Sequence, residues 1–138
     1  MTEYPQLQTI VLDATDVRGL AEFYRRLLGL QYRPGDEPPA DGAADDHDWL
    51  VLTNADGARQ LAFQAVPVLP RVTWPDASGV AQQLHLDLAV PNRAALEIQR
   101  ERALELGAEL LHDRSDDPEE SFYVFADPPG HPFCILVA

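Results

Sequence analysis

The chain has 138 residues, 46% hydrophobic and 24% charged, so it can form one domain with a substantial core and is not disordered as a whole. Acidic residues outnumber Lys and Arg by 23 to 10, and the net charge of −13 disfavours nucleic acid and anionic membranes as partners and suits a neutral or cationic ligand. All 10 basic residues are Arg, which excludes Schiff-base and Walker-type phosphate chemistry. The sequence shows neither a membrane span nor a secretory signal, so we expect a cytoplasmic protein.

The first half of the chain predicts the order βαβββ. A strand precedes Asp16, whose short side chain is suited to cap a helix. Apolar residues then recur at helical spacing as far as Gly29, a plausible helix stop. A short apolar stretch, a polar loop, a strand beginning at Trp49, a turn and a last strand over 61–66 complete this half.

The second half repeats the same order. The stretch 122–130 aligns without gaps on 49–57, which indicates an internal duplication. Asn92 takes the place of the first helix cap, and Gly107 the place of the helix stop. We therefore predict one α+β domain over 1–138, made of a first βαβββ module over about 5–66, a Pro-rich linker over about 67–83 and a second module over about 84–138. Neither module alone could bury both faces of its sheet.

Two acidic segments, 36–48 and 113–120, are interpreted as solvated loops without chemistry. The histidines within them, His47 and His112, are expected to be solvated as well. The single cysteine, Cys134, cannot form an internal disulfide. It follows Phe133 and precedes Ile135, which favours a small buried side chain over a nucleophile.

Alternation along the strands selects candidate ligand-binding residues. Around the first strand of the second half, leucines occupy one face, and His85 and Asp87 the other. The leucine face should pack on the helix, so the polar face lines either solvent or a ligand cavity. Ala89 also lies on the polar face, and the equivalent places in the first half are Thr9, Val11 and Asp13. The role of two matched aromatic residues is undecided, because each could line the cavity or fill the core. These residues are Trp49 and Phe122.

Four pieces of the sequence together resemble the vicinal oxygen chelate superfamily, which includes glyoxalase I, bleomycin-resistance proteins and extradiol dioxygenases. The pieces are 16–29 (DVRGLAEFYRRLLG), 85–90 (HLDLAV), 106–108 (LGA) and 127–134 (DPPGHPFC). The resemblance implies paired βαβββ modules forming a U-shaped, eight-stranded mixed sheet, commonly in a homodimer, with the site on the concave face.

The same resemblance implies where a metal would bind, on the first and last strand of each module. Those positions fall on Thr9, Gln64, His85 and Cys134. A threonine hydroxyl is a poor ligand for zinc or iron, so no cofactor is predicted. If a divalent ion (Zn, Fe, Ni or Mn) is bound, the candidate ligands are Gln64, His85 and Cys134.

The sequence therefore predicts a protein without a complete metal site that binds a small organic molecule, and its acidity suits a cationic one. Its ligand pocket is expected to include eight residues: Thr9, Asp13, Trp49, Gln64, His85, Asp87, Phe122 and Cys134. One alternative is a metal-dependent lyase, isomerase or dioxygenase that uses His85. Another is metal-free acid–base catalysis by His85 and Asp87. Trp74 could serve as an interface or lid residue, or pack over a sheet edge.

Overall fold

The structure, a computed structural model, describes residues 3–138. Contacts between residues divide the chain into two compact units, the first ending at Val68 and the second beginning at Leu69. Each unit contains one helix and one four-stranded sheet. Within the described residues, no helix has the length and apolar character needed to cross a membrane.

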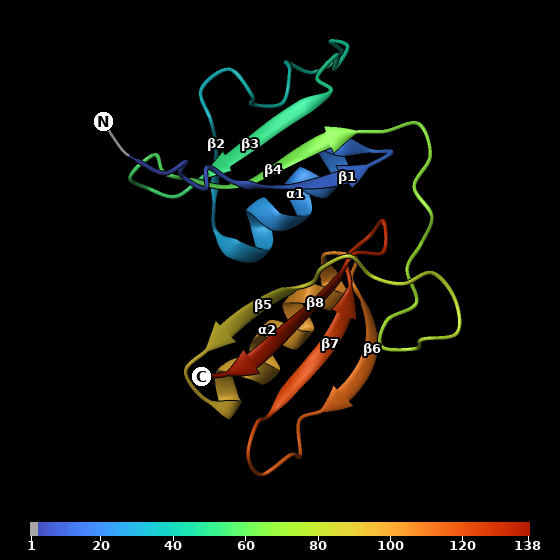
Figure 1. Cartoon of the computed structure of the whole chain (residues 1–138). Helices are drawn as coiled ribbons and strands as arrows, with labels where there is room; N and C mark the ends of the chain where they lie inside the picture. The colour runs from blue at the N-terminus through green and yellow to red at the C-terminus, as the bar shows by residue number, and fades with distance from the viewer. Residues whose placement is uncertain (1–2) are drawn as a thin grey trace. The chain divides into compact units, whose positions relative to one another are not determined.

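The first unit has the order βαβββ (Figure 1). Its elements are β1 (Ile10–Ala14), α1 (Val17–Leu28), β2 (Gln31–Tyr32), β3 (Trp49–Thr53) and β4 (Arg59–Ala65). The strand order in the sheet is β1-β4-β3-β2, in which β1 is parallel to β4 and the other pairs are antiparallel. The Asp16 side chain caps α1 by accepting from Gly19 N at 3.0 Å, and Gly29 ends the helix in the left-handed region at φ 67°.

The second unit repeats this order, with its helix capped by Asn92, which accepts from Ala95 N at 2.8 Å. Its elements are β5 (Leu86–Val90), α2 (Arg93–Glu105), β6 (Glu109–Arg114), β7 (Phe122–Ala126) and β8 (Pro132–Val137). The strand order is β5-β8-β7-β6, and β5 is parallel to β8. Two βαβββ modules with mixed sheets are thus confirmed.

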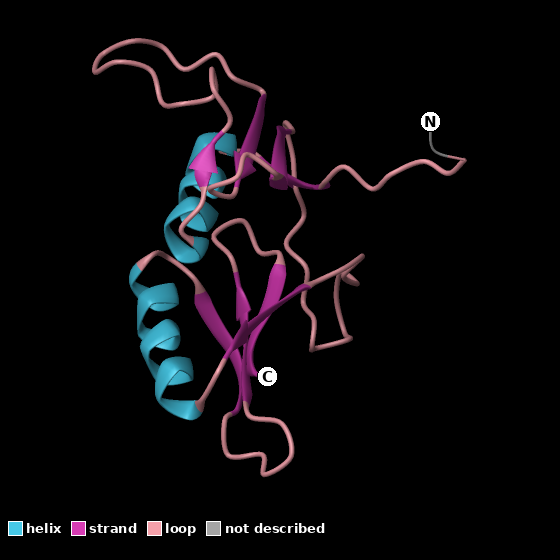
Figure 2. Ribbon diagram, turned by 90° about the vertical axis from the view of Figure 1, so that its left-hand side faces the viewer, coloured by secondary structure: helices cyan, strands magenta, loops and turns pink. Residues whose placement is uncertain are grey.

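In each unit the helix covers one face of the sheet, as Figure 2 shows. Tyr24 of α1 stacks on Phe63 of β4 with ring centroids 6.0 Å apart, and both side chains are fully buried. In the second unit the hydroxyl of Tyr123 on β7 donates to Glu97 of α2 at 2.6 Å. Because side chains alternate along a strand, these contacts define which residues point away from the helix. We call that side the far face of each sheet.

The pairing register relates the two units position by position. Val11 of β1 pairs with Ala62 of β4, and Asp87 of β5 pairs with Cys134 of β8. Each pair is the second position of its strand pairing, and each lies on the far face. Thr9 and His85 likewise stand directly before β1 and β5, so the predicted equivalence of these two residues is confirmed.

The predicted equivalence of Gln64 and Cys134 is wrong. Gln64 pairs with Trp49, whereas the matched aromatic Phe122 pairs with Leu136. Gln64 therefore corresponds to Leu136, two residues beyond Cys134. A bulge at Leu52 and Thr53 adds one residue to the first unit's hairpin, so the two last strands cannot be aligned by a gapless count from the turn; the bulge accounts for one residue and not for the whole offset.

The segment 69–83, predicted as a linker, belongs to the second unit. Arg71 anchors it by donating to the carbonyl oxygen of Pro128 at 2.9 Å and to the carboxylate of Glu109 at 3.0 Å. The Trp74–Pro75 peptide bond in this segment is cis. The Trp74 ring stacks on His85, directly before β5.

Candidate functional site

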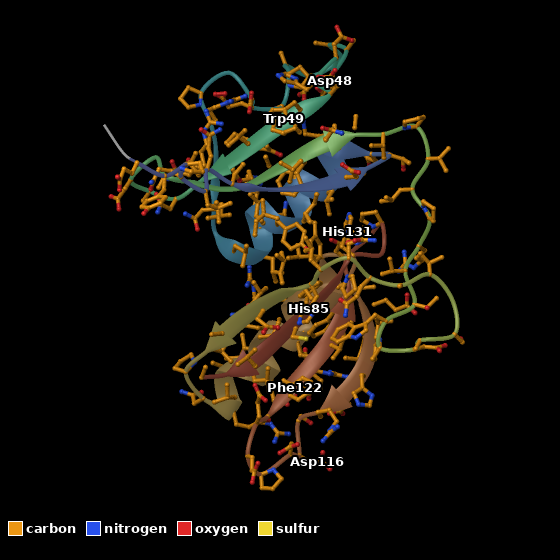
Figure 3. All side chains as sticks on the ribbon, in the orientation of Figure 1. Asp48, Trp49, His85, Asp116, Phe122 and His131 are labelled. Carbon is orange, nitrogen blue, oxygen red and sulfur yellow. The ribbon has the colours of Figure 1, made fainter. Side chains whose placement is uncertain are left out.

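Three groups with acid–base or metal-binding chemistry converge in the second unit. One ligand atom each from His85, Asp87 and Cys134 lie within 4.8 Å of one another. Nε2 of His85 is 3.3 Å from Oδ1 of Asp87. We call these residues the His85 cluster; Figure 3 labels His85 on the ribbon of the second unit.

Strand geometry explains why these residues meet. His85 and Asp87 are two residues apart at the start of β5, so their side chains point to the same face. Cys134 is the register partner of Asp87 on the neighbouring parallel strand β8. The predicted common face of His85 and Asp87 therefore agrees with the structure, and Cys134, whose face alternation left open, lies beside them.

The His85 ring is held from its other side by Trp74. The indole and imidazole rings stack with centroids 4.6 Å apart and an interplanar angle of 11°. The side chain of Gln82 lies beside both rings, with its carboxamide 2.8 Å from Trp74 Nε1 and 3.2 Å from His85 Nδ1. Trp74 thus directly contacts a residue of the cluster.

The Cys134 thiol is poorly suited to nucleophilic attack. The side chain is buried, and burial raises its pKa to about 12, with further contributions from the charge of Asp87, from a hydrogen bond to Asp87 and from the charge of Glu120. The thiol is therefore protonated at neutral pH and donates to Asp87. The interpretation of Cys134 as a small buried side chain agrees with this environment.

The donor types of the His85 cluster suit a zinc-like ion. Zinc binds a thiolate or an imidazole nitrogen with a free lone pair, so its binding would release the proton of the Cys134 thiol. The Trp74 indole N–H can only donate, so the Gln82 oxygen faces it and the Gln82 amide nitrogen faces Nδ1 of His85. This leaves the imidazole proton on Nε2, the nitrogen nearest the cluster. The donor types of these residues therefore fit a zinc-like ion, and binding would have to displace the protons that the cluster carries without a metal.

Phe122, a predicted pocket residue, and His131, a turn residue, have separate roles in the second unit. Phe122 is half-buried on β7, on the same face as the cluster, and the guanidinium of Arg114 lies 6.0 Å from its ring centre. His131 belongs to the turn after β7, where its backbone N–H and that of Gly130 donate to the buried carboxylate of Asp127 at 2.8 and 3.1 Å. Asp127 is thus the residue that fixes this turn.

In the first unit, three predicted residues form a row on the far face. Asp13 of β1, Gln64 of β4 and Trp49 of β3 are register partners. Trp49 also lines a shallow surface depression of about 390 Å³ with four residues of the preceding loop: Ala44, Asp46, His47 and Asp48. Thr9 is half-buried before β1, and its hydroxyl donates to the carbonyl oxygen of Ile10 at 3.3 Å.

The interpretation of 36–48 as a solvated loop is wrong for part of the segment. Asp36 is buried and accepts from Val51 N at 2.9 Å. Arg18 of α1 donates to the Asp36 carbonyl oxygen at 2.6 Å and to the Asp45 carboxylate at 2.7 Å, which holds the pKa of Asp45 well below its usual range. The half-buried ring of His47 contacts Asp45 at 2.8 Å, which raises the pKa of His47. The number of acidic residues in the segment does not reveal these contacts, because they depend on Arg18, which lies elsewhere in the sequence.

Sequence reasoning missed Gln82 completely and left Trp74 unplaced. Both precede the recognisable strand motif, in a Pro-rich stretch without periodicity. His85 and Asp87 could be predicted, because the alternation of polar and apolar residues shows that they lie on one face of a strand. The supporting residues carried no comparable signal.

Two four-stranded mixed sheets in βαβββ modules define the fold of the vicinal oxygen chelate superfamily. Residues 9–136 match the model of the glyoxalase-like domain family, so the chain belongs to that family. No curated protein matches the chain.

Solved structures with the same fold come from several bacteria. A glyoxalase/dioxygenase from Nostoc punctiforme is 20% identical, with a TM-score of 0.67 and coverage of 96% of this chain and 90% of its own. A glyoxalase/bleomycin resistance protein/dioxygenase family enzyme from Burkholderia phytofirmans is 15% identical, with a TM-score of 0.66 and coverages of 94% and 96%. A lactoylglutathione lyase from Agrobacterium tumefaciens is 14% identical, with a TM-score of 0.61 and coverages of 99% and 96%. At these identities the likeness concerns the fold.

Proposed function

We propose that the far face of the second unit's sheet binds a small organic cation without the help of a metal ion. The observation that carries this proposal is the exposed Asp87 carboxylate within the His85 cluster. The Asp87 side chain is 60% exposed, whereas the neighbouring Cys134 is buried. Asp87 is therefore the part of the cluster that a dissolved ligand can reach.

The surroundings of Asp87 support an organic cation. Phe122 and Leu136 are half-buried register partners on the same face, and Ala89 is exposed two residues beyond Asp87. These side chains offer apolar contact beside a negative charge, an arrangement that suits an amine or quaternary ammonium group attached to an apolar body. The net charge of −13 would also speed the approach of a cation.

Calorimetry with paired probes tests the proposal. The probes are aromatic amines and quaternary ammonium compounds, each matched with a neutral analogue of the same shape. We expect the cationic member of a pair to bind more tightly, and Asp87→Asn to weaken it about tenfold while leaving the neutral member unchanged. Asp116→Asn, in an exposed loop of the same unit, is the matched control for net charge. Equal losses in the two variants would attribute the effect to long-range charge and contradict the proposal.

The convergence of His85, Asp87 and Cys134 within 4.8 Å also favours a second candidate, a metal-dependent lyase, isomerase or dioxygenase. Metal binding in this candidate would release the protons on Cys134 and on Nε2 of His85. Elemental analysis of protein purified without a chelator or an affinity tag separates the two functions. Near-stoichiometric zinc, iron, nickel or manganese that disappears in His85→Ala would establish the second candidate and overturn the first.

A further inference from the structure

The Gln82 carboxamide contacts two groups that each hydrogen-bond in only one direction. The Trp74 indole N–H can only donate, and it lies 2.8 Å from the carboxamide oxygen. The Leu84 carbonyl can only accept, and it lies 3.3 Å from the amide nitrogen. Reversing the amide would set donor against donor at Trp74 and acceptor against acceptor at Leu84. These two partners therefore fix the orientation of Gln82.

The fixed amide then determines the tautomer of His85. The Gln82 amide nitrogen is 3.2 Å from Nδ1 of His85, so Nδ1 must accept that hydrogen bond. A neutral imidazole that accepts at Nδ1 carries its proton at Nε2. Nε2 in turn lies 3.3 Å from the Asp87 carboxylate, which favours a proton at that position.

We propose that Trp74 and Gln82 are positioning residues that lock neutral His85 in its Nε2–H tautomer, facing Asp87. Stacking of the Trp74 ring on His85, with centroids 4.6 Å apart, fixes the plane of the imidazole, and Gln82 fixes its proton. In this state His85 consequently acts as a hydrogen-bond donor toward Asp87, not as a lone-pair ligand. This inference concerns the protein without any ligand and goes beyond the proposed binding function.

Nitrogen NMR measures the tautomer directly. Two-bond proton–nitrogen spectra of ¹⁵N-labelled protein at about pH 8.5, where an ordinary histidine is neutral, distinguish a protonated from an unprotonated ring nitrogen. Comparison with the His85→Gln spectrum assigns the His85 signals among the 4 histidines of the chain. We expect the Nε2–H pattern in the wild type, and an Nδ1–H pattern there would overturn the proposal whatever the variants show.

Three variants test the roles of Gln82 and Trp74. Gln82→Glu places an acceptor opposite Nδ1, so His85 should move to a form protonated at Nδ1. Trp74→Phe keeps an aromatic ring but removes the N–H, so Gln82 can turn and both tautomers should be visible. Gln83→Glu, at the exposed neighbouring residue, adds the same charge and should leave the wild-type pattern. Identical His85 signals in Gln82→Glu and Gln83→Glu would show that Gln82 does not set the tautomer.

Zinc provides a second readout, because Zn²⁺ at Nε2 has to displace the proton. Partners that orient a ligating histidine for a metal commonly strengthen binding by about 10- to 100-fold. A partner that keeps the proton on the ligating nitrogen should weaken binding by a comparable factor. We therefore expect Zn²⁺ to bind Trp74→Phe about tenfold more tightly than the wild type, as measured by calorimetry, and the gain to vanish in the Trp74→Phe, His85→Gln double variant. Equal Zn²⁺ affinity in wild type and Trp74→Phe would contradict the lock.

Discussion

The two units share one architecture but place their polar side chains in different rows of the sheet. In the first unit the polar row is Asp13, Gln64 and Trp49, at the fourth position of the β1–β4 pairing. The equivalent row of the second unit is apolar: Ala89, Leu136 and Phe122. Conversely, the second unit has its reactive groups at the second position, where the first unit has Val11 and Ala62.

This difference shows that the scaffold alone does not produce the His85 cluster. Thr9, Val11 and Ala62 occupy the first-unit positions of His85, Asp87 and Cys134 on strands of the same register. The second unit also supplies Trp74 and Gln82 from the segment before its first strand. Divergence between the two modules has thus confined this chemistry to one of them, while the helix-facing sides stay alike.

The helix-facing sides should therefore show the largest effects on stability. Phe63 of β4 and Ile135 of β8 are equivalent, buried residues. Truncating Phe63 to Ala removes its stacking on Tyr24 and leaves a cavity, so we expect a loss of about 3–5 kcal/mol in the free energy of unfolding. Ile135→Ala should cost about 2–5 kcal/mol for the same reason. Urea denaturation measures both losses.

The matched control is Ile98→Ala on α2, because the Ile98 side chain is 59% exposed. It should change the free energy of unfolding by less than about 0.5 kcal/mol. A loss at Ile98 as large as that at Ile135 would mean that burial within the second unit does not determine these costs.

The Cys134 thiol gives the next largest effect. Burial raises its pKa to about 12, so the reactive thiolate is scarce in the folded protein. We expect iodoacetamide at pH 8 to label the folded protein at least about a hundredfold more slowly than the urea-unfolded protein. Mass spectrometry over time measures both rates.

Asp87→Asn sharpens this experiment, because the charge of Asp87 contributes to the raised pKa of Cys134. Labelling should become faster in this variant, while Asp116→Asn should label at the wild-type rate. An unchanged labelling rate in Asp87→Asn would show that the charge of Asp87 does not affect the pKa of the Cys134 thiol.

Most of the fold could be predicted from local patterns. Asp16 and Asn92 are typical helix-capping residues and so predict where both helices begin. The internal duplication aligns Trp49 with Phe122. The last strand of the first unit was located, but its register was not, because the bulge at Leu52 and Thr53 adds a residue that leaves no clear sequence signal.

The candidate site could be predicted only where one strand encodes it. His85 and Asp87 share a face by alternation alone, and the family motif added Cys134 from a second strand. Gln82 and Trp74 act through side-chain hydrogen bonding and stacking in an irregular segment. Asp36 is similar, since its burial depends on hydrogen bonding to β3. Side-chain stacking and hydrogen bonding in irregular segments follow no sequence periodicity, so a sequence pattern does not reveal them.

The smallest effect concerns a glutamate and tyrosine pair that both units contain. Tyr32 donates to Glu22 at 2.6 Å in the first unit, and Tyr123 donates to Glu97 at 2.6 Å in the second. The Glu22 side chain is 24% exposed and that of Glu97 is 44% exposed. The first pair is thus better shielded from solvent, and Arg25 adds a hydrogen bond to Glu22 at 2.6 Å.

Arg25 is the largest cause that lowers the pKa of Glu22 to about 2, although partial burial opposes it, and the Tyr32 hydrogen bond helps. Because this folded-state pKa lies below the ordinary value of 4.5, ionised Glu22 stabilises the fold fully above about pH 4.5. That stabilisation is lost as the pH falls from 4.5 toward 2. We expect Glu22→Gln to cost about 1 kcal/mol at pH 7 and to flatten the pH dependence of the free energy of unfolding in this range.

Glu97→Gln is the matched variant, and it should cost less than Glu22→Gln because solvent screens its partners more strongly. Urea denaturation at pH 7 and at pH 3 compares both variants with the wild type. At pH 3 the cost of Glu22→Gln should be smaller than at pH 7, since the wild type has begun to lose the contribution of the ionised carboxylate. A cost that is the same at both pH values would show that Glu22 stabilises the first unit by packing and not by its charge.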